Sequence, residues 1–206
     1  LKSLNIEVVK LYCEPNGNFP HNPEPLKKNL TQLSKKVIDT NADLGIAVDP
    51  DVDRLVFVCE NGEIFGEENT LVACSDYVLE KSPGSTVSNL SSSRALADIT
   101  KKHNQIHFYS AVGEVNVVKK MKECSAVIGG EGNGGVIYPK SHYGRDAIVG
   151  IGLFLSLFVE RGLKASQLLD TYPKYYMLKE KVNISSKLNV DKILKKIAKK
   201  KKKKKV

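Results

Sequence analysis

The sequence predicts an α/β protein made of two consecutive α/β domains with mixed, mainly parallel sheets. Short runs rich in β-branched residues alternate with segments whose apolar residues recur at helical spacing, which is typical of strands joined by crossover helices. Turn signals such as Asn61-Gly62 and Pro83-Gly84 separate these runs. A length of 206 residues and a hydrophobic content of 41% suffice for one large or two small cores.

The first predicted domain covers residues 1–82 and begins with a loosely alternating run at 6–12, which predicts a strand. The stretch up to residue 25 is rich in proline and glycine and is predicted as loop. An amphipathic helix should follow, because apolar residues recur at helical spacing at Leu26, Leu30, Leu33, Val37 and Ile38.

Two short apolar runs, residues 44–48 and 55–59, predict strands joined by a tight loop. The Asn61-Gly62 turn indicates a hairpin with a returning strand at 64–65. A helix over residues 71–79 then ends near Pro83, where we place the domain boundary.

The second predicted domain covers residues 83–180, with its strands and helices in alternation. Because crossovers between strands are right-handed and favour parallel pairing, ligands are expected at the carboxyl ends of the strands. We predict strands at 86–90, 106–110 and 126–129. One helix should begin near Arg94, capped by Ser91-Ser92-Ser93, and two more should span 114–122 and 147–159. A short helix is predicted at 167–171, capped by Ser166. An extended segment at 176–184 leads into residues 181–206, a linker and a lysine-rich tail.

The net charge of +9 belongs to the tail. Residues 192–206 hold ten lysines and no acid, and the rest of the chain has 22 basic and 23 acidic residues, a charge near −1. The basic balance therefore gives no support to nucleic acid binding by the folded part. The tail itself is compatible with a basic helix attracted to anionic surfaces, or with no function.

The four cysteines lie far apart and form no Cys-x-x-Cys motif, so we interpret them as reduced thiols of a cytoplasmic protein. The most apolar run, residues 147–159, has thirteen residues and is too short to span a bilayer, so no membrane partner is expected. No signal peptide is visible. The chain begins without Met on what resembles the end of a helix, and we expect it to be a fragment.

The loop between the first two apolar runs carries the strongest functional signal. This acidic loop (residues 49–54) reads Asp49-Pro50-Asp51-Val52-Asp53-Arg54. Three carboxylates at alternate positions repel each other unless a cation lies among them, and oxygen-only ligands suit Mg²⁺ or Ca²⁺. Arg54 adds a fixed fork suited to a phosphate oxygen.

Two other interpretations of the acidic loop are a solvated acidic turn and an EF-hand. The EF-hand has Glu60 at its twelfth position, but Arg54 stands where that loop requires glycine, and strands flank it in place of helices.

The glycine-rich segment (residues 129–135) follows the third strand of the second domain. Glycines with no side chains allow Glu131 and Asn133 to project close to the backbone. A carboxylate acceptor beside an amide suits vicinal sugar hydroxyls, although a flexible loop with two polar residues has the same sequence pattern.

Further candidates lie at the ends of predicted helices. Arg145 precedes the helix at 147–159 and either helps to hold a phosphate or pairs with an acid. The turn after the middle strand offers Gly113 and Glu114, with Asn116, as weaker candidates. His21 is interpreted as a structural loop residue.

These motifs resemble those of the α-D-phosphohexomutases, the family of phosphoglucomutase, phosphomannomutase and phosphoglucosamine mutase. Asp-x-Asp-x-Asp-Arg between two strands is similar to the family's magnesium loop. The glycine-rich segment resembles the family's Gly-Glu-x-Ser-Gly-His sugar loop, with Asn133 at the serine and Gly135 at the histidine position. The stretch 19–25 resembles the Phe-Pro-His-x-Pro-x-Pro segment that opens the second domain.

The resemblance covers residues 1–180 and implies domains two and three of a four-domain enzyme. Such an enzyme moves a phosphoryl group between positions 1 and 6 of a hexose phosphate, through a phosphoserine and a bisphosphate intermediate. It implies Mg²⁺ on Asp49, Asp51 and Asp53, a phosphate contact from Arg54, and a phosphosugar partner oriented by Glu131 and Asn133. A hexose bisphosphate is the implied activator, and the fragment alone is expected to be inactive. The sequence indicates neither the hexose nor the oligomeric state.

One alternative comes from another functional class. A non-catalytic module that binds Mg²⁺ or Ca²⁺ and recognises a carbohydrate or a protein would also need an acidic loop and a polar glycine-rich segment. An upstream Ser-His-Asn-Pro loop in the parent reading frame would distinguish the enzyme from this module.

Overall fold

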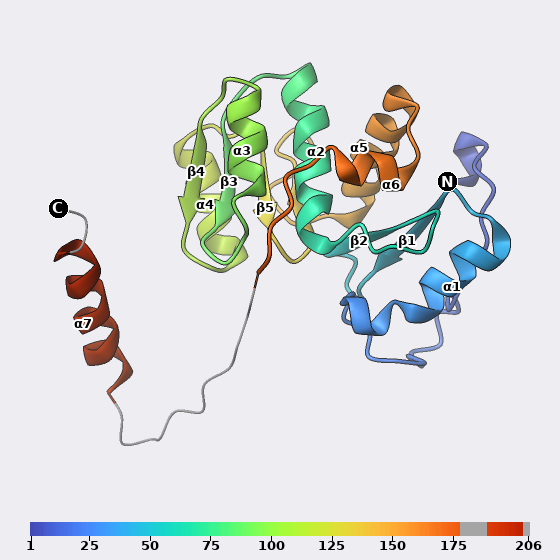
Figure 1. Cartoon of the computed structure of the whole chain (residues 1–206), viewed down its shortest axis with the longest axis horizontal. Coiled ribbons are helices and arrows are strands. Elements are labelled where there is room, and N and C mark those ends of the chain that lie inside the picture. The colour runs from blue at the N-terminus through green and yellow to red at the C-terminus, as the bar shows by residue number, and fades with distance from the viewer. Residues whose placement is uncertain (178–188, 204–206) are drawn as a thin grey trace. The chain divides into compact units, whose positions relative to one another are not determined.

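The computed structural model of the chain describes residues 1–177 and 189–203 (Figure 1). Residues 1–175 form one compact unit and residues 176–206 form another. In the first unit, two short 3₁₀ turns at Lys2–Leu4 (η1) and Lys27–Asn29 (η2) precede the helix α1 (Thr31–Thr40). Helix α1 is capped at its carboxyl end by Asn41, which takes the left-handed conformation. The sequence predicted an amphipathic helix here.

A two-stranded antiparallel sheet carries the acidic loop. Strands β1 (Leu44–Val48) and β2 (Leu55–Cys59) pair with Leu44 opposite Cys59, so the acidic loop is the hairpin connection, as predicted. The returning strand at 64–65 is reduced to one bridge between Val58 and Ile64. The prediction of a strand at 6–12 is wrong: those residues are coil and pair with no strand among the described residues.

The second sheet has the strand order β4-β3-β5-β6. Strand β3 (Thr86–Asn89) pairs in parallel with β4 (His107–Ser110) and with β5 (Ile128–Glu131). The short edge strand β6 (Gly135–Ile137) returns antiparallel to β5. The predicted α/β class with mainly parallel pairing is thus confirmed.

Helices cover both faces of this sheet (Figure 1). Helices α2 (Glu67–Lys81) and α3 (Ala95–Lys102) pack with Ile128 on one face, and α4 (Glu114–Glu123) packs on the other over Val87. Thr86 is paired with Ile128, so the next residue, Val87, points to the opposite face. The final helices of this unit are α5 (Ala147–Arg161) and α6 (Ala165–Asp170).

Three sequence predictions in this region need correction. The third strand of the domain extends to Glu131 and does not end at 129, and the glycine-rich segment continues into β6, so it is a hairpin and not a flexible loop. Helix α6 begins earlier than predicted, so Ser166 lies inside it, where its hydroxyl donates a hydrogen bond to Glu60.

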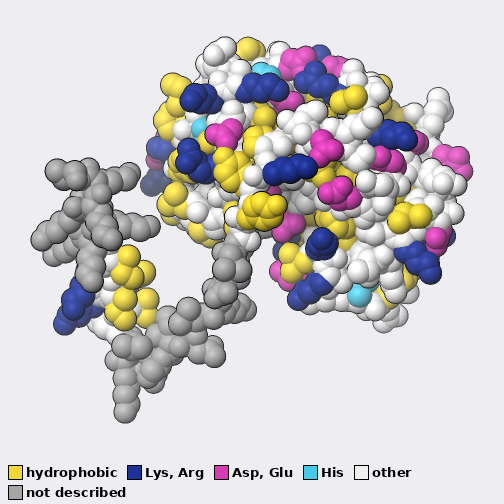
Figure 2. Space-filling model, in the orientation of Figure 1, with side chains coloured by type: hydrophobic (Ala, Val, Ile, Leu, Met, Phe, Trp, Pro, Cys, Tyr) yellow, Lys and Arg dark blue, Asp and Glu magenta, His cyan; other side chains and the backbone are white. Residues whose placement is uncertain are grey.

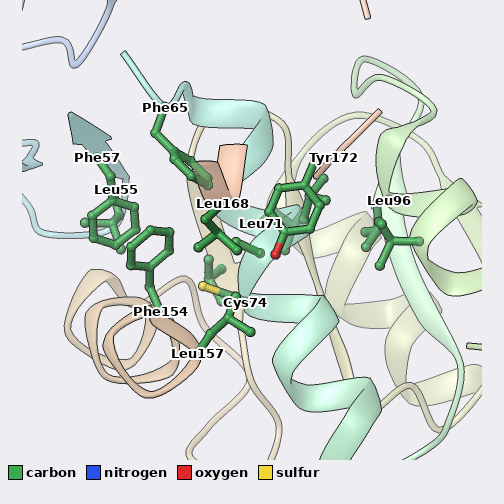
Figure 3. Packing of buried hydrophobic residues seen from close by; sticks show 14 of the residues in the cluster. Leu55, Phe57, Phe65, Leu71, Cys74, Leu96, Phe154, Leu157, Leu168 and Tyr172 are labelled. Carbon is green, nitrogen blue, oxygen red and sulfur yellow. The ribbon is translucent and has the colours of Figure 1, made fainter. Parts of the chain in front are cut away.

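One hydrophobic core joins the β1–β2 hairpin to the second sheet (Figure 3). The rings of Phe57 on β2 and Phe154 on α5 stack at a centroid distance of 3.7 Å, and Phe65 contacts Phe154 edge-on at 5.1 Å. Leu71 and Cys74 of α2 complete this part of the core. The hairpin is therefore held against the second sheet by aromatic packing.

The second unit contains the helix α7 (Val190–Lys203), which bears the lysine run. Its apolar side chains at Ile193, Leu194 and Ile197 are exposed. The extended segment predicted at 176–184 lies mostly outside the described residues. On the face of the first unit shown in Figure 2, basic and acidic side chains are interspersed, as expected for a body with a charge near zero.

None of the helices in residues 1–177 and 189–203 has the length and apolar character required to cross a bilayer. The cysteines are free thiols, with Cys59 and Cys74 buried and Cys13 exposed.

Protonation of the buried His107 is expected to lower the stability of the fold in acid. Its ring nitrogens lie 2.7 Å from Thr86 Oγ1 and 3.0 Å from Ser88 Oγ, and burial lowers its pKa to about 4. The unfolded chain, with a histidine pKa near 6.5, binds the proton more readily, so this stability is complete above about pH 6.5 and falls as the pH approaches 4. We expect a loss of about 1–3 kcal/mol over that range, measured by chemical denaturation.

The matched control for this prediction is an exposed histidine. A His107→Gln variant should show a flatter dependence of unfolding free energy on pH, whereas His21→Gln should keep the wild-type slope. Identical slopes for wild type and His107→Gln would contradict the assignment.

Candidate functional site

The acidic loop closes on the carboxylate of Asp49, which lies directly after β1. Asp49 Oδ1 accepts hydrogen bonds from the backbone N–H groups of Asp53 (3.1 Å) and Arg54 (3.0 Å). Val52 takes a left-handed conformation (φ 59°) at the tip of the loop. This turn brings Asp49, Asp51 and Asp53 together: one oxygen of each lies within 4.8 Å of the others.

Arg54 stabilises the loop from the side. Its Nε donates to Asp49 Oδ2 at 2.5 Å, and its Nη1 lies 3.6 Å from Glu24 Oε1. Burial disfavours the charged form of Asp49, but the hydrogen bonds from the backbone and guanidinium of Arg54 outweigh it and lower the pKa of Asp49. Asp49 is therefore held ionised at neutral pH.

Asp53 shows the opposite balance. Burial raises its pKa, Arg145 opposes that effect, and the neighbouring carboxylates of Asp49 and Asp51 raise it again. Asp53 Oδ1 is buried and makes no hydrogen bond to any described residue. Arg54 Nε lies 3.6 Å from this oxygen. An oxygen-only donor set with mutual repulsion and one buried oxygen that lacks a hydrogen bond fits a hard divalent cation such as Mg²⁺.

The glycine-rich segment contacts the acidic loop's hairpin directly. The N–H of Leu55 on β2 donates to the carbonyl oxygen of Gly134 at 3.1 Å. Gly134 has a φ of +94°, and a Cβ there would lie 2.4 Å from the Leu55 carbonyl oxygen. Only glycine permits this close approach of two backbones, so the two motifs share one site.

Glu131, the last residue of β5, is buried, and both of its carboxylate oxygens accept hydrogen bonds. Its Oε1 accepts from Asn89 Nδ2 (2.6 Å) and from the N–H of Gly113 (3.2 Å), and its Oε2 accepts from Arg145 Nη1 (2.8 Å). The structure thus places Glu131 at the carboxyl ends of three parallel strands, where the sequence predicted a ligand site. Its role toward a sugar stays a prediction.

Asn133 and Asn116 have local partners. Asn133 Oδ1 accepts from the N–H of Gly135 at 3.2 Å and shapes the turn between β5 and β6. Asn116 Nδ2 donates to the Val112 carbonyl oxygen at 2.9 Å, within its own helix start.

Arg145 lies at the centre of the site. Its Nη2 bonds Asp53 Oδ2 of the acidic loop, its Nη1 bonds Glu131, and its Nε lies 3.5 Å from Glu114 Oε2. Its backbone N–H also donates to Glu114 Oε1 at 2.9 Å. Of the two interpretations from sequence, pairing with acids is what the structure shows, and a phosphate contact stays a prediction.

The loop after β3 contributes residues that the sequence indicated only as a helix cap. Ser92 Oγ accepts from the N–H of Gly132 at 2.9 Å, and the N–H of Ser93 donates to Glu68 Oε2 at 2.9 Å. Asn89 Oδ1 accepts from the Ser92 hydroxyl while its amide binds Glu131. Their position after a parallel strand was the available signal.

Comparison with known proteins gives matches along most of the chain. Residues 67–175 match the family model for phosphoglucomutase/phosphomannomutase, alpha/beta/alpha domain III, and residues 1–62 match that for domain II. The matches meet between residues 62 and 67, and the boundary that we place after residue 82 stays a prediction.

Among curated relatives, a phosphoglucomutase/phosphomannomutase of Thermococcus kodakarensis is 37% identical over 186 residues, covering 89% of this chain and 41% of the relative. A phosphoglucosamine/phosphogalactosamine mutase of Sulfurisphaera tokodaii is 32% identical over 190 residues, covering 88% and 42%. The chain thus spans about two fifths of the length of these relatives.

A crystal structure of a phosphoglucomutase/phosphomannomutase family protein from Burkholderia thailandensis superposes with a TM-score of 0.75 at 31% identity, covering 84% of this chain and 38% of that one. The family models, the relatives and the solved structure all indicate the same family. The chain belongs to the phosphoglucomutase/phosphomannomutase family.

Proposed function

We propose that this chain forms the cation site and the sugar-orienting site of a phosphohexomutase, which moves a phosphoryl group between positions 1 and 6 of a hexose phosphate. The observation that carries the proposal is the contact of both motifs with one side chain: Arg145 bonds Asp53 of the acidic loop and Glu131 of the glycine-rich segment. A hexose phosphate needs phosphoryl and hydroxyl recognition within the length of one small molecule, and this arrangement supplies both.

In this proposal, Asp49, Asp51 and Asp53 hold Mg²⁺. When bound there, the cation would neutralise charge on the transferring phosphoryl group. The phosphoserine belongs to a segment outside these 206 residues. Arg54 contributes a second positive charge: Asp49 holds its Nε, while among the described residues its Nη groups have only the 3.6 Å contact with Glu24. A guanidinium held in this way is preorganised for a phosphate oxygen.

Orientation of the sugar is assigned to the residues around Glu131, which Arg145 binds in addition to Asp53. The Glu131 carboxylate has acceptor capacity beyond its three present donors, because two oxygens offer about four lone-pair sites. Gly113 donates to this carboxylate, Asn133 belongs to the same glycine-rich segment, and Glu114 binds Arg145, so these residues contribute further polar groups. The substrate binds in two orientations during one cycle, and a hexose bisphosphate acts as the activator.

The test is an assay of the enzyme that contains this chain. Glucose, mannose and glucosamine 1-phosphates are each supplied with Mg²⁺ and a catalytic amount of the corresponding bisphosphate, and formation of the 6-phosphate is measured. Conversion of at least one substrate, abolished by EDTA and restored by Mg²⁺, is expected. An enzyme that binds Mg²⁺ but converts none of the three would contradict the proposal.

Removal of the Glu131 side chain should chiefly raise KM. Hydroxyl contacts made in ground and transition states alike are lost, at about 1.5–3 kcal/mol for a charged hydrogen bond, so KM should rise at least tenfold with a smaller change in kcat. Glu123→Ala is the matched control, because this acid is exposed on α4 and pairs with Lys120, so KM should stay unchanged. A Glu131→Ala enzyme that is folded and has a normal KM would remove the sugar assignment.

A further inference from the structure

Arg145 contacts carboxylates from three separate segments of the chain. Its two terminal nitrogens bind Asp53 of the acidic loop and Glu131 of β5, and its Nε faces Glu114 at the start of α4. The side chain is only 19% exposed, and those of Asp53 and Glu131 are 18% and 6% exposed. Such pairs are screened less by solvent than surface ion pairs, so a change at one is felt by the other.

The stem of Arg145 has little freedom to move. Residue 145 forms an antiparallel bridge with Ile137 of β6, and its N–H is bonded to Glu114. A Cβ added to Gly135 would lie 2.4 Å from Arg145 Cδ, which shows how closely the stem packs over β6. Because the stem is held, a change in the Asp53 contact must shift the guanidinium relative to Glu131 and cannot be absorbed by a swing of the whole side chain.

Asp53 is the carboxylate through which a cation would act on this arrangement. Its Oδ2 is bonded to Arg145, and its buried Oδ1, beside Asp49 and Asp51, makes no hydrogen bond to a described residue and lies 3.6 Å from Arg54 Nε. A cation on Oδ1 draws charge away from Oδ2 and weakens its bond to Arg145. The guanidinium then depends more on Glu131 and Glu114.

We propose that Arg145 is a positioning residue that couples cation binding at the acidic loop to the orientation of the Glu131 carboxylate. This inference rests on the proposed function for its cation site but adds a link between the two halves of the site. The consequence for the enzyme is that the sugar-binding carboxylate takes its working position only when the cation is present.

The coupling has two reporters on the far side of Glu131. The backbone N–H of Gly113 and the side-chain amide of Asn89 both donate to Oε1, the oxygen that Arg145 does not bind. The Leu55–Gly134 hydrogen bond also links the hairpin of the acidic loop to the glycine-rich segment. Gly113 and Asn89 take no part in that bond. The Asn89 side chain bonds Glu131 and not Arg145 or Glu114, so a change at its amide reports on Glu131. Gly113 adjoins Glu114, which Arg145 also contacts, so its shift counts only together with that of Asn89.

The experiment is a Mg²⁺ titration of the isotope-labelled 206-residue chain, followed by amide NMR shifts. Wild type should show shifts in the acidic loop and also at Gly113 and the Asn89 side chain. In Arg145→Gln the acidic-loop shifts should persist, while the two reporter shifts should fall by about threefold or more. Mg²⁺ should bind this variant about tenfold more tightly, because one nearby positive charge is gone.

Arg145→Lys separates charge from geometry. It keeps the positive charge, so its Mg²⁺ affinity should stay within about twofold of wild type, but one ammonium cannot reproduce the rigid fork between two carboxylates, so the reporter shifts should be lost. Arg161→Gln is the matched control, since Arg161 also bonds two acids, Asp76 and Glu80, away from the site. Its titration should equal that of wild type.

The outcomes separate this inference from the proposed function. Acidic-loop shifts with unchanged reporter shifts in both Arg145 variants would overturn the coupling and leave the cation site standing. Absence of any acidic-loop shift in wild type would overturn the cation site, and the coupling with it. Should Arg145→Gln fail to fold, Arg145→Lys decides the question.

Discussion

Replacing Asp51 by asparagine is expected to lower kcat of the mutase containing this chain by about a hundredfold or more, with KM changed by less than about threefold. Asp51 is exposed and makes no hydrogen bond to any described residue, so its charge does not stabilise the loop. Its loss removes one cation ligand and with it stabilisation that matters most in the transition state.

Asp51 gives a cleaner test than Asp49. The carboxylate of Asp49 accepts two backbone hydrogen bonds and the Arg54 guanidinium, so its replacement would disturb the loop as well as the cation. Asp39, an exposed acid on α1, is the matched control, and Asp39→Asn should leave kcat unchanged. A normal kcat in Asp51→Asn, with Mg²⁺ affinity also unchanged, would show that the acidic loop is only a solvated turn.

The hairpin that carries the acidic loop could be predicted from the sequence because all its determinants are local. Two runs of β-branched residues flank a loop with a proline and three aspartates, and the predicted strands agree with β1 and β2 in both bounds. Local propensity and the final structure agree there, so no long-range information was needed.

The glycine-rich segment could not be predicted in the same way. Glycine has low strand propensity, so the predicted strand ended at Gly129, and Gly130 was assigned to the segment that follows it. In the structure they belong to β5, because a Cβ at Gly129 would lie 2.7 Å from Met121 Sδ and one at Gly130 would lie 2.0 Å from the Gly135 carbonyl oxygen. Packing against α4 and β6 selects glycine at these positions, and that packing is tertiary.

The partners of Arg145 show the same limit. Sequence alone indicated that an acid could pair with this side chain, but the acids are Asp53 and Glu131, which reach it only when the hairpin docks on the second sheet. Asn89, which holds the other oxygen of Glu131, was missed for the same reason. The parallel-sheet rule predicted the region of the site but not its bonds.

The docking of the hairpin depends on Phe154, and Phe154→Ala is expected to lower the free energy of unfolding by about 3–5 kcal/mol. Phe154 is fully buried, stacks on Phe57 of β2 and contacts Phe65 edge-on, so its removal leaves a cavity between the hairpin and α5 (Figure 3). Chemical denaturation of the chain measures the loss.

The position of Phe154 gives this variant a second, functional effect. Phe57 lies on the strand that follows the acidic loop, and Phe154 lies on the helix that follows Arg145, so their stacking fixes the distance that Arg145 spans to Asp53. The folded variant should therefore bind Mg²⁺ more weakly, although neither ring contacts the cation site. Phe19→Ala, at an exposed phenylalanine, should change the free energy of unfolding by less than about 0.5 kcal/mol. A Phe154→Ala chain with wild-type stability and Mg²⁺ affinity would mean that polar contacts such as the Leu55–Gly134 and Arg145–Asp53 bonds suffice to hold the hairpin in place.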